Sequence, residues 1–171
     1  MLRRVAFKKA ILAGAFGALA WELVTRALLW FGFPVFDLVY VLGTMFFGSG
    51  AAFWKWWIAG LALHATVGAI WAIFYAYFFW SMFDYPYVLQ GILFSLLPAA
   101  LAGLIMIPQM DFMHPLIANG KWRPNGVFAA AIGWSGPVMV VLGHLVYGAV
   151  LGGIYTKPVG YPAGRKISFY G

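Results

Sequence analysis

The chain contains no cysteine, and only four of its 171 residues are acidic. Without a thiol it can form no disulfide, no thiolate nucleophile and no cysteine-based metal site. Charged residues make up 9% of the sequence, whereas hydrophobic residues make up 64%. A soluble domain of this composition would expose too much apolar surface to water. The scarcity of charge therefore predicts an integral membrane protein, with residues 1–171 forming a single membrane domain.

The sequence also lacks the motifs of common catalytic sites. We find no glycine-rich phosphate loop, no nucleophile elbow and no metalloprotease helix motif, so we expect no enzyme activity. Lys and Arg number 11 and give a formal net charge of +7. Basic residues that flank membrane spans account for this excess more simply than nucleic acid does. No nucleic-acid partner is expected, whereas membrane lipids are.

Long hydrophobic runs predict an all-α, polytopic protein with four transmembrane helices, at about residues 10–33, 56–80, 89–107 and 128–155. Each run suits a span of ~20 residues. The first run follows a basic N-terminus in the manner of a signal peptide, but we interpret it as an uncleaved helix. Residues 32–55 carry Pro and Gly that interrupt a span, so an interfacial helix or surface loop is expected there. Residues 156–171 are expected to form a solvated tail.

Basic residues are distributed unevenly along the chain. The two termini hold seven Lys or Arg, whereas the two long loops hold Lys55, Lys121 and Arg123. Four crossings place both termini on one side of the membrane, and the positive-inside rule makes that side cytoplasmic. We therefore expect a multi-pass protein of the bacterial inner (cytoplasmic) membrane with both termini in the cytoplasm.

A pattern of His, Gly and Tyr occurs twice with the same spacing. The copies are His64, Gly68 and Tyr75, then His144, Gly148 and Tyr155, and Pro34 with Asp37 and Pro108 with Asp111 precede them. Recurrence at a period of about eighty residues predicts two tandem helix-hairpin repeats. We place them at about residues 10–80 and 89–155. Their corresponding helices should run in the same direction, so the duplication is expected to be parallel.

Small residues recur along each expected helix at multiples of four, a spacing that lets transmembrane helices approach closely. They are Ala10, Gly14 and Ala18; Gly60, Gly68 and Ala72; Gly91, Ser95, Ala99 and Gly103; and Gly136, Gly148 and Gly152. We therefore expect these ridges to form the contacts between helices.

Four polar residues fall on the same ridges. Glu22, His64 and His144 have similar expected depths in the membrane. Arg26 follows Glu22 by four residues and is expected to pair with it or to extend its charge outward to the membrane surface. Charged or polar groups in a span usually face other helices. The cluster suits a buried hydrogen-bond network, a proton or ion path, or a metal, pigment or haem b site with His64, His144 and Glu22 as ligands.

Other polar residues have plainer interpretations. Asp37 and Asp111 are expected to cap short helices after the two prolines, although they could add oxygen ligands at the outer surface. His114 lies in the second outer loop, beside methionines that we interpret as packing residues. Tyr75 and Tyr155 are expected to anchor the inner membrane interface.

Two parts of the sequence form a recognisable pattern: Gly32, Phe33, Pro34, Asp37, Leu38, Leu42 and Gly43, and the segment GHLVYGAVLGGIY from Gly143 to Tyr155. This pattern resembles that of an uncharacterised family of small bacterial four-helix membrane proteins. The resemblance covers most of the chain outside the tail, and its motifs are moderately specific. It implies a four-helix membrane fold and a bacterial source, but no activity or cofactor.

The aromatic content is high, with nine Trp and 16 Phe. Large aromatic faces can pack against other membrane subunits, pigments or quinones. The sequence thus favours a non-catalytic accessory subunit of a larger bacterial membrane complex of electron transfer or photosynthesis. The alternatives are a haem- or metal-binding membrane protein in its own right and a small transporter.

Overall fold

The computed structural model describes residues 5–80 and 82–156, and all regular structure in these ranges is helical. Four helical segments are long and apolar enough to cross a membrane: Phe7–Trp30, Phe53–Phe79, Tyr87–Met113 and Ser135–Ile154. The predicted all-α class and the four long apolar helices are therefore confirmed.

The chain begins with α1 (Phe7–Trp30), α2 (Leu38–Phe47) and α3 (Phe53–Phe74), which a π-helical turn, η1 (Tyr75–Phe79), extends. The next span consists of α4 (Tyr87–Leu101), a second π-helical turn, η2 (Ala102–Met106), and α5 (Ile107–Met113). A short α6 (Pro115–Ala118) and a 3-10 segment, η3 (Val127–Ile132), lead to α7 (Ser135–Ile154).

Two predicted helix ends differ from the structure. The third span continues past Pro108 to Met113, because Pro108 lies in the first turn of α5, where its missing N–H leaves no bond unmade. The fourth begins at Ser135, later than the expected residue 128. Phe128 and Ala129 have left-handed backbone angles, with φ of 53° and 56°, and these interrupt a right-handed helix.

The long helices alternate in direction. The start of α1 meets the end of α7, where the Ala6 N–H donates to the Tyr155 hydroxyl at 3.3 Å. The end of the second span lies at the same end of the molecule, since the Tyr75 and Tyr155 rings are 6.1 Å apart. The second span also meets the third there, with the Trp80 and Tyr87 rings 6.4 Å apart.

Glycines make the closest contacts between helices, as the small-residue ridges predicted. The main packing pairs are α1 with α3, α2 with α3, α4 with α7 and α1 with α7. A side chain at Gly68 would collide with the backbone of Gly14, and one at Gly148 would collide with Gly91. Likewise, a side chain at Gly43 in α2 would collide with the backbone of α3. These crossings thus depend on the absence of a Cβ.

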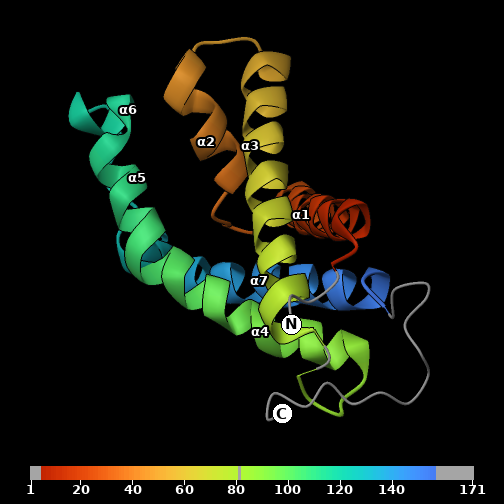
Figure 1. Cartoon of the computed structure of the whole chain (residues 1–171). Coiled ribbons are helices and arrows are strands. Elements are labelled where there is room, and N and C mark those ends of the chain that lie inside the picture. Colours follow the sequence, from red (N-terminus) through yellow and green to blue (C-terminus); the bar gives the residue numbers. More distant parts are fainter. Residues whose placement is uncertain (1–4, 81, 157–171) are drawn as a thin grey trace.

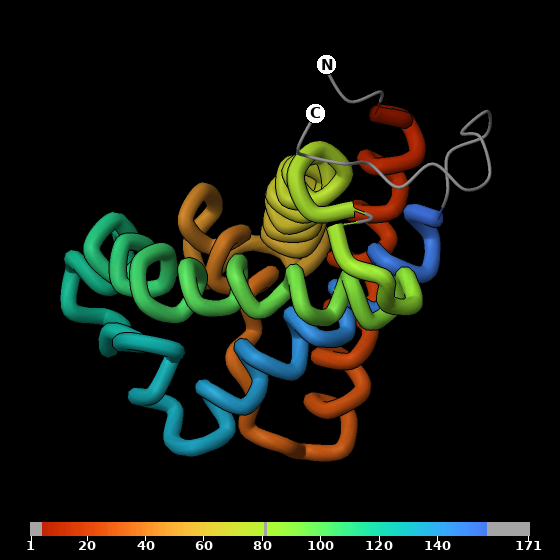
Figure 2. The backbone as a smooth tube through the Cα atoms, turned by 60° about the horizontal axis from the view of Figure 1, so that its bottom comes forward, coloured from red at the N-terminus to blue at the C-terminus, as the bar shows by residue number. Residues whose placement is uncertain are grey.

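The helices do not form a regular bundle of aligned helices. Figures 1 and 2 show α3 crossing α4 steeply, while α5 and α6 rise at the left of Figure 1, apart from α2 and α3 nearer its centre. Residues 32–55 hold the short apolar helix α2, which is not among the four segments long enough to cross a membrane. Close glycine contacts let α2 pack directly against α3.

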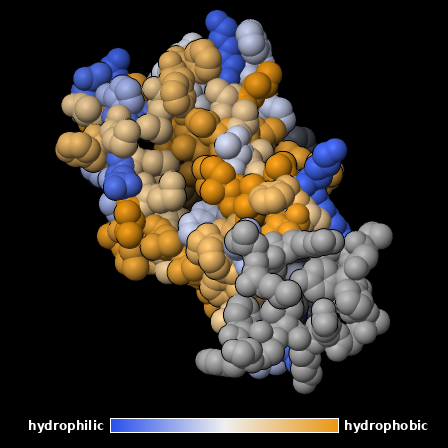
Figure 3. Space-filling model, viewed as in Figure 1, coloured by the Kyte–Doolittle hydropathy of each residue, from blue (hydrophilic) through white to orange (hydrophobic). Residues whose placement is uncertain are grey.

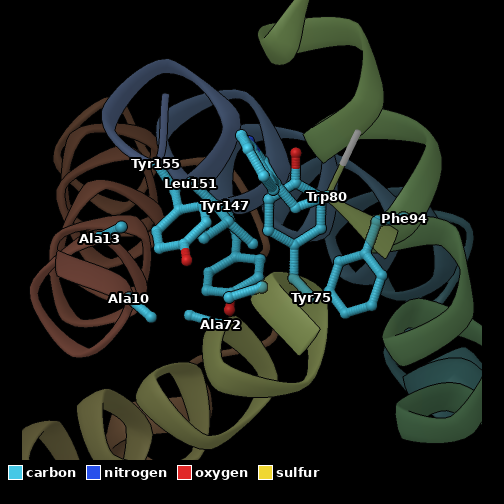
Figure 4. Packing of buried hydrophobic residues seen from close by; sticks show 10 residues of the cluster. Ala10, Ala13, Ala72, Tyr75, Trp80, Phe94, Tyr147, Leu151 and Tyr155 are labelled. Carbon is cyan, nitrogen blue, oxygen red and sulfur yellow. The ribbon is translucent and has the colours of Figure 1, made fainter. Parts of the chain in front are cut away.

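The main hydrophobic core lies where the start of α1 and the ends of α3 and α7 meet the first half of α4. Figure 4 shows the rings of Tyr75, Tyr147, Tyr155 and Phe94 packed together, beside small residues of α1 and α3. Tyr75 and Tyr155 are 0% and 1% exposed. Neighbouring helices enclose both rings, which does not fit their expected role as anchors of the inner membrane interface.

Candidate functional site

A small cavity lies among the helices, below the surface of the molecule. Residues of α2 and α3 line one wall, those of α4, η2 and α5 line the other, and α1 and α7 also contribute. Its volume is about 90 Å³, and its lining is almost entirely apolar. Figure 3 shows this face of the molecule hollowed and mainly hydrophobic. The main packing partners of α3 are α1 and α2, whereas that of α4 is α7, so α3 and α4 leave this space between them.

His64 and His144 both line this cavity, from α3 and α7 respectively. Each side chain is buried, with residue exposures of 6% and 7%. The indole of Trp21 in α1 contacts both imidazoles, with ring centroids 4.9 Å from His64 and 4.6 Å from His144. Trp21 thus brings the two histidines together, a role that the sequence analysis missed because Trp21 carries no ionisable group.

The hydrogen bonds fix part of the chemistry of these rings. His144 Nδ1 lies 2.7 Å from the Val140 carbonyl oxygen, and a carbonyl only accepts, so Nδ1 carries the proton. Because ionising an imidazole in apolar surroundings is costly, the ring is neutral and its Nε2 has a free lone pair. His64 Nδ1 is buried and has no hydrogen-bond partner among the described residues.

Tyr147 is a third functional side chain at the cavity, and the sequence analysis also missed it. Its hydroxyl donates to the Gly68 carbonyl oxygen at 2.6 Å and so joins α7 to α3. Gly17 of α1 allows the Tyr147 ring to approach, since a Cβ at Gly17 would collide with that ring. The signal available in the sequence was the three-residue spacing from His144, which places both residues on one helix face.

Glu22 lies in a different polar group from the two histidines. Its carboxylate accepts from Arg26 Nε at 2.6 Å and from Trp57 Nε1 at 3.2 Å. Arg26 also pairs with Asp37, so one guanidinium bridges α1 to the segment before α2. The expected pairing of Arg26 with Glu22 is present, but Glu22 is not a third donor at the histidine site. Within residues 5–80 and 82–156, no group of three His, Asp or Glu could hold a metal ion.

The two aspartates have different roles. Asp37 caps α2 as expected, because its Oδ1 accepts from the Tyr40 N–H at 2.9 Å. The expectation that Asp111 caps a helix is wrong, since it lies within α5. Its two oxygens accept from Asn125 Nδ2 at 2.6 Å and from the Gly126 N–H at 2.7 Å. Asp111 therefore holds the loop before η3 against α5.

His114 is completely buried and connects α6 to α2. Its Nδ1 accepts from the Leu116 N–H at 3.2 Å, so Nε2 carries the proton and donates to the Val41 carbonyl oxygen at 3.1 Å. The ring also stacks on Trp122, with centroids 4.9 Å apart. Both nitrogens are occupied, which makes His114 a structural residue.

The cavity does not fit a haem or pigment macrocycle. An engineered protein cavity of about 150 Å³ holds benzene, which is far smaller than a macrocycle. The volume here is about 90 Å³. Trp21 also contacts both imidazoles, so its indole occupies space that a macrocycle between them would need. The two histidines therefore do not hold a haem in this arrangement.

Comparison with known proteins finds no matching family model, curated protein or solved structure.

Proposed function

We propose that the protein is a non-catalytic accessory subunit of a larger membrane complex, of the kind that serves electron transfer or photosynthesis. The observation that carries this proposal is a set of strongly exposed aromatic side chains near the outer end of the spans. They are Trp30 at 87%, Phe31 at 75%, Phe112 at 88% and Trp134 at 77% exposure. Figure 2 shows the end of α1 and the start of α7 toward one side of the molecule.

Lipid contact alone accounts for some of these side chains, because Trp and Tyr are common at membrane interfaces. Phe31 and Phe112 have no polar group to place at the headgroups. Aromatic side chains are also enriched in the buried centres of protein interfaces. The four residues, which we call the aromatic set, are therefore proposed to pack against a neighbouring subunit.

If the protein is such a subunit, replacing the aromatic set should release it from its complex. We expect the variant with Trp30→Ala, Phe31→Ala, Phe112→Ala and Trp134→Ala to migrate alone in a native gel of solubilised native membranes. The unaltered protein should co-migrate with other membrane proteins. A control with Phe16→Ala and Ile70→Ala removes exposed apolar side chains from the middle of α1 and α3 and should stay in the complex. Migration of the unaltered protein as a single chain would refute the proposal.

The bacterial cytoplasmic membrane, with both termini in the cytoplasm, is the proposed location. The described end of α7 lies beside the start of α1, since Lys9 Nζ donates to Thr156 Oγ1 at 3.0 Å. Basic residues beyond these two helix ends would then share one side of the membrane. Lys157, Arg165 and Lys166, which contribute to that count, lie outside the described residues.

Reporter fusions test this orientation. A fusion after Tyr85 should report a cytoplasmic position, because this turn lies beside the two helix ends that carry the basic residues. A fusion after Asn119 should report the opposite side, since the chain crosses the membrane between them. A cytoplasmic signal from the Asn119 fusion would contradict the assignment.

We further propose that the two halves arose by tandem duplication. Gly68 and Gly148 occupy matching positions in the sequence pattern. Each makes the closest contact with a glycine in the first helix of its own half, Gly14 and Gly91 respectively. The match between these contacts supports a parallel duplication, which superposition of residues 10–80 on 89–155 would test.

A further inference from the structure

We propose that the cavity binds the hydroxyl end of a slender apolar lipid, of which a long-chain alcohol is the simplest example. This inference is independent of the accessory-subunit proposal. It rests on three features of the site: a buried imidazole with an unused acceptor, apolar walls, and a volume smaller than that of an engineered cavity that holds benzene.

The imidazoles define the polar end of the ligand. His144 Nε2 can only accept a hydrogen bond, because Nδ1 holds the proton and donates to Val140. His64 Nδ1 is buried without a partner, and an unpaired buried polar atom is costly. The hydroxyl of Tyr147 does not fill this need, because it is bonded to Gly68. The unused acceptor of His144, whose ring lines the cavity, is therefore available to a ligand there, whereas His64 Nδ1 is enclosed by protein.

A hydroxyl group suits this acceptor better than other lipid groups. It has a proton to donate to His144 Nε2, and it brings no charge into these apolar surroundings. A ketone or ether has no proton to donate to His144. A carboxylate would also lack a donor, and its charge would be costly in apolar surroundings.

The walls define the rest of the ligand. Val67 and Trp71 of α3 face Pro98, Ala102 and Met106 of the third span across the cavity. The π-helical turn η2 begins at Ala102, and such turns are frequent at functional sites. The cavity is only partly enclosed, and α3 and α4 are both membrane-spanning candidates. A chain held by its hydroxyl would therefore extend between these helices into the lipid.

Size decides between a chain and a ring. The volume of about 90 Å³ is smaller than the roughly 150 Å³ that holds benzene in an engineered core. The ring of a quinol or sterol exceeds this space, whereas the end of a linear chain is narrower. A divalent metal ion is the competing occupant, but the site offers only two imidazoles and no third protein ligand from the described residues.

The experiment compares three probes of equal chain length on the purified full-length protein: dodecan-1-ol, 1-methoxydodecane and dodecane. We expect dodecan-1-ol to raise the melting temperature in a saturable manner and the other two to bind at least about tenfold more weakly, since neither can donate to His144. In ¹⁵N NMR of histidine-labelled protein, dodecan-1-ol should shift the His144 Nε2 signal. His114, whose nitrogens are occupied, provides the internal reference.

Variants locate the site. His144→Phe keeps a flat ring but removes the acceptor, so binding of dodecan-1-ol should weaken about tenfold. Thr66→Ala is the matched control, because Thr66 lies two residues from His64 on an exposed face of α3. If His144→Phe does not fold, the NMR titration of the unaltered protein still decides the question.

Three results would overturn the proposal. Equal binding of dodecane and dodecan-1-ol would show an apolar cleft without hydroxyl recognition. No saturable effect of any probe would show that the cavity holds only water. Stabilisation by Zn²⁺ alone, with shifts of both histidine signals and no response to dodecan-1-ol, would assign the site to a metal.

Discussion

Arg26→Met is expected to lower the free energy of unfolding by about 3 kcal/mol, because it leaves two carboxylates without their counter-ion. Arg26 pairs with both Glu22 and Asp37, and the Glu22 side chain is only 6% exposed. This loss of free energy lies at the lower end of the range for breaking a buried ion pair. The reason is that the Arg26 side chain is 30% exposed, so water screens part of its charge. Thermal or chemical unfolding in detergent measures the loss.

A charge-neutral variant separates unpaired charge from lost packing. The triple change Arg26→Met, Glu22→Gln and Asp37→Asn should recover most of the stability, because no ion remains unpaired and Asn still caps α2. Lys55→Met removes an exposed cation and should change stability by less than about 0.5 kcal/mol. If Arg26→Met were as stable as Lys55→Met, the ion pairs of Arg26 would contribute nothing measurable to the free energy of unfolding.

Gly152→Leu is expected to destabilise the protein by about 3 kcal/mol or to prevent its folding, because the side chain would collide with backbone atoms. A Cβ at Gly152 would lie 2.8 Å from the Tyr87 carbonyl carbon and 3.0 Å from the Val88 Cα. Gly148 and Gly152 together form a GxxxG motif in α7, and this motif brings α4 into backbone contact. Forcing these helices apart would also remove the packing contacts between α4 and α7.

The adjacent glycine provides the control. A Cβ at Gly153 meets only Val88 Cγ2 at 3.8 Å, an ordinary contact distance, and this residue is exposed. Gly153→Leu should therefore be neutral or slightly stabilising, since Leu favours a helix more than Gly does. Equal destabilisation by the two substitutions would mean that the chain needs Gly in α7 for its backbone and not for close packing.

Predictions from local sequence succeeded where the physical cause is local. Low charge and long apolar runs sufficed to identify four spans, because a bilayer accepts only segments that satisfy their own backbone hydrogen bonds. The pairing of Glu22 with Arg26 follows from a four-residue spacing on one helix, and the cap by Asp37 follows from its place before α2. The glycine ridges identified the contact faces, since only a missing Cβ allows such close approach.

Predictions failed where distant segments decide the surroundings of a residue. Tyr75 and Tyr155 are aromatic residues near helix ends, and only the packing of other helices shows that they are enclosed. Asp111 resembles a cap in the sequence, yet it serves a loop 14 to 15 residues away. The end of the third span was placed too early because Pro108 was interpreted as a break, whereas it begins α5.

By itself, the sequence determined that His64, His144 and Glu22 lie on the packing faces of their helices, because helical periodicity fixes the direction of each side chain. Which of them meet was decided by the tertiary structure alone. Equal depth along parallel helices would have placed all three together, but α3 crosses α4 and α7 steeply. Trp21 therefore joins the two histidines at the cavity, while Arg26 and Trp57 hold Glu22 in a separate network. The crossing of helices depends on contacts between residues far apart in the chain, which no local periodicity encodes.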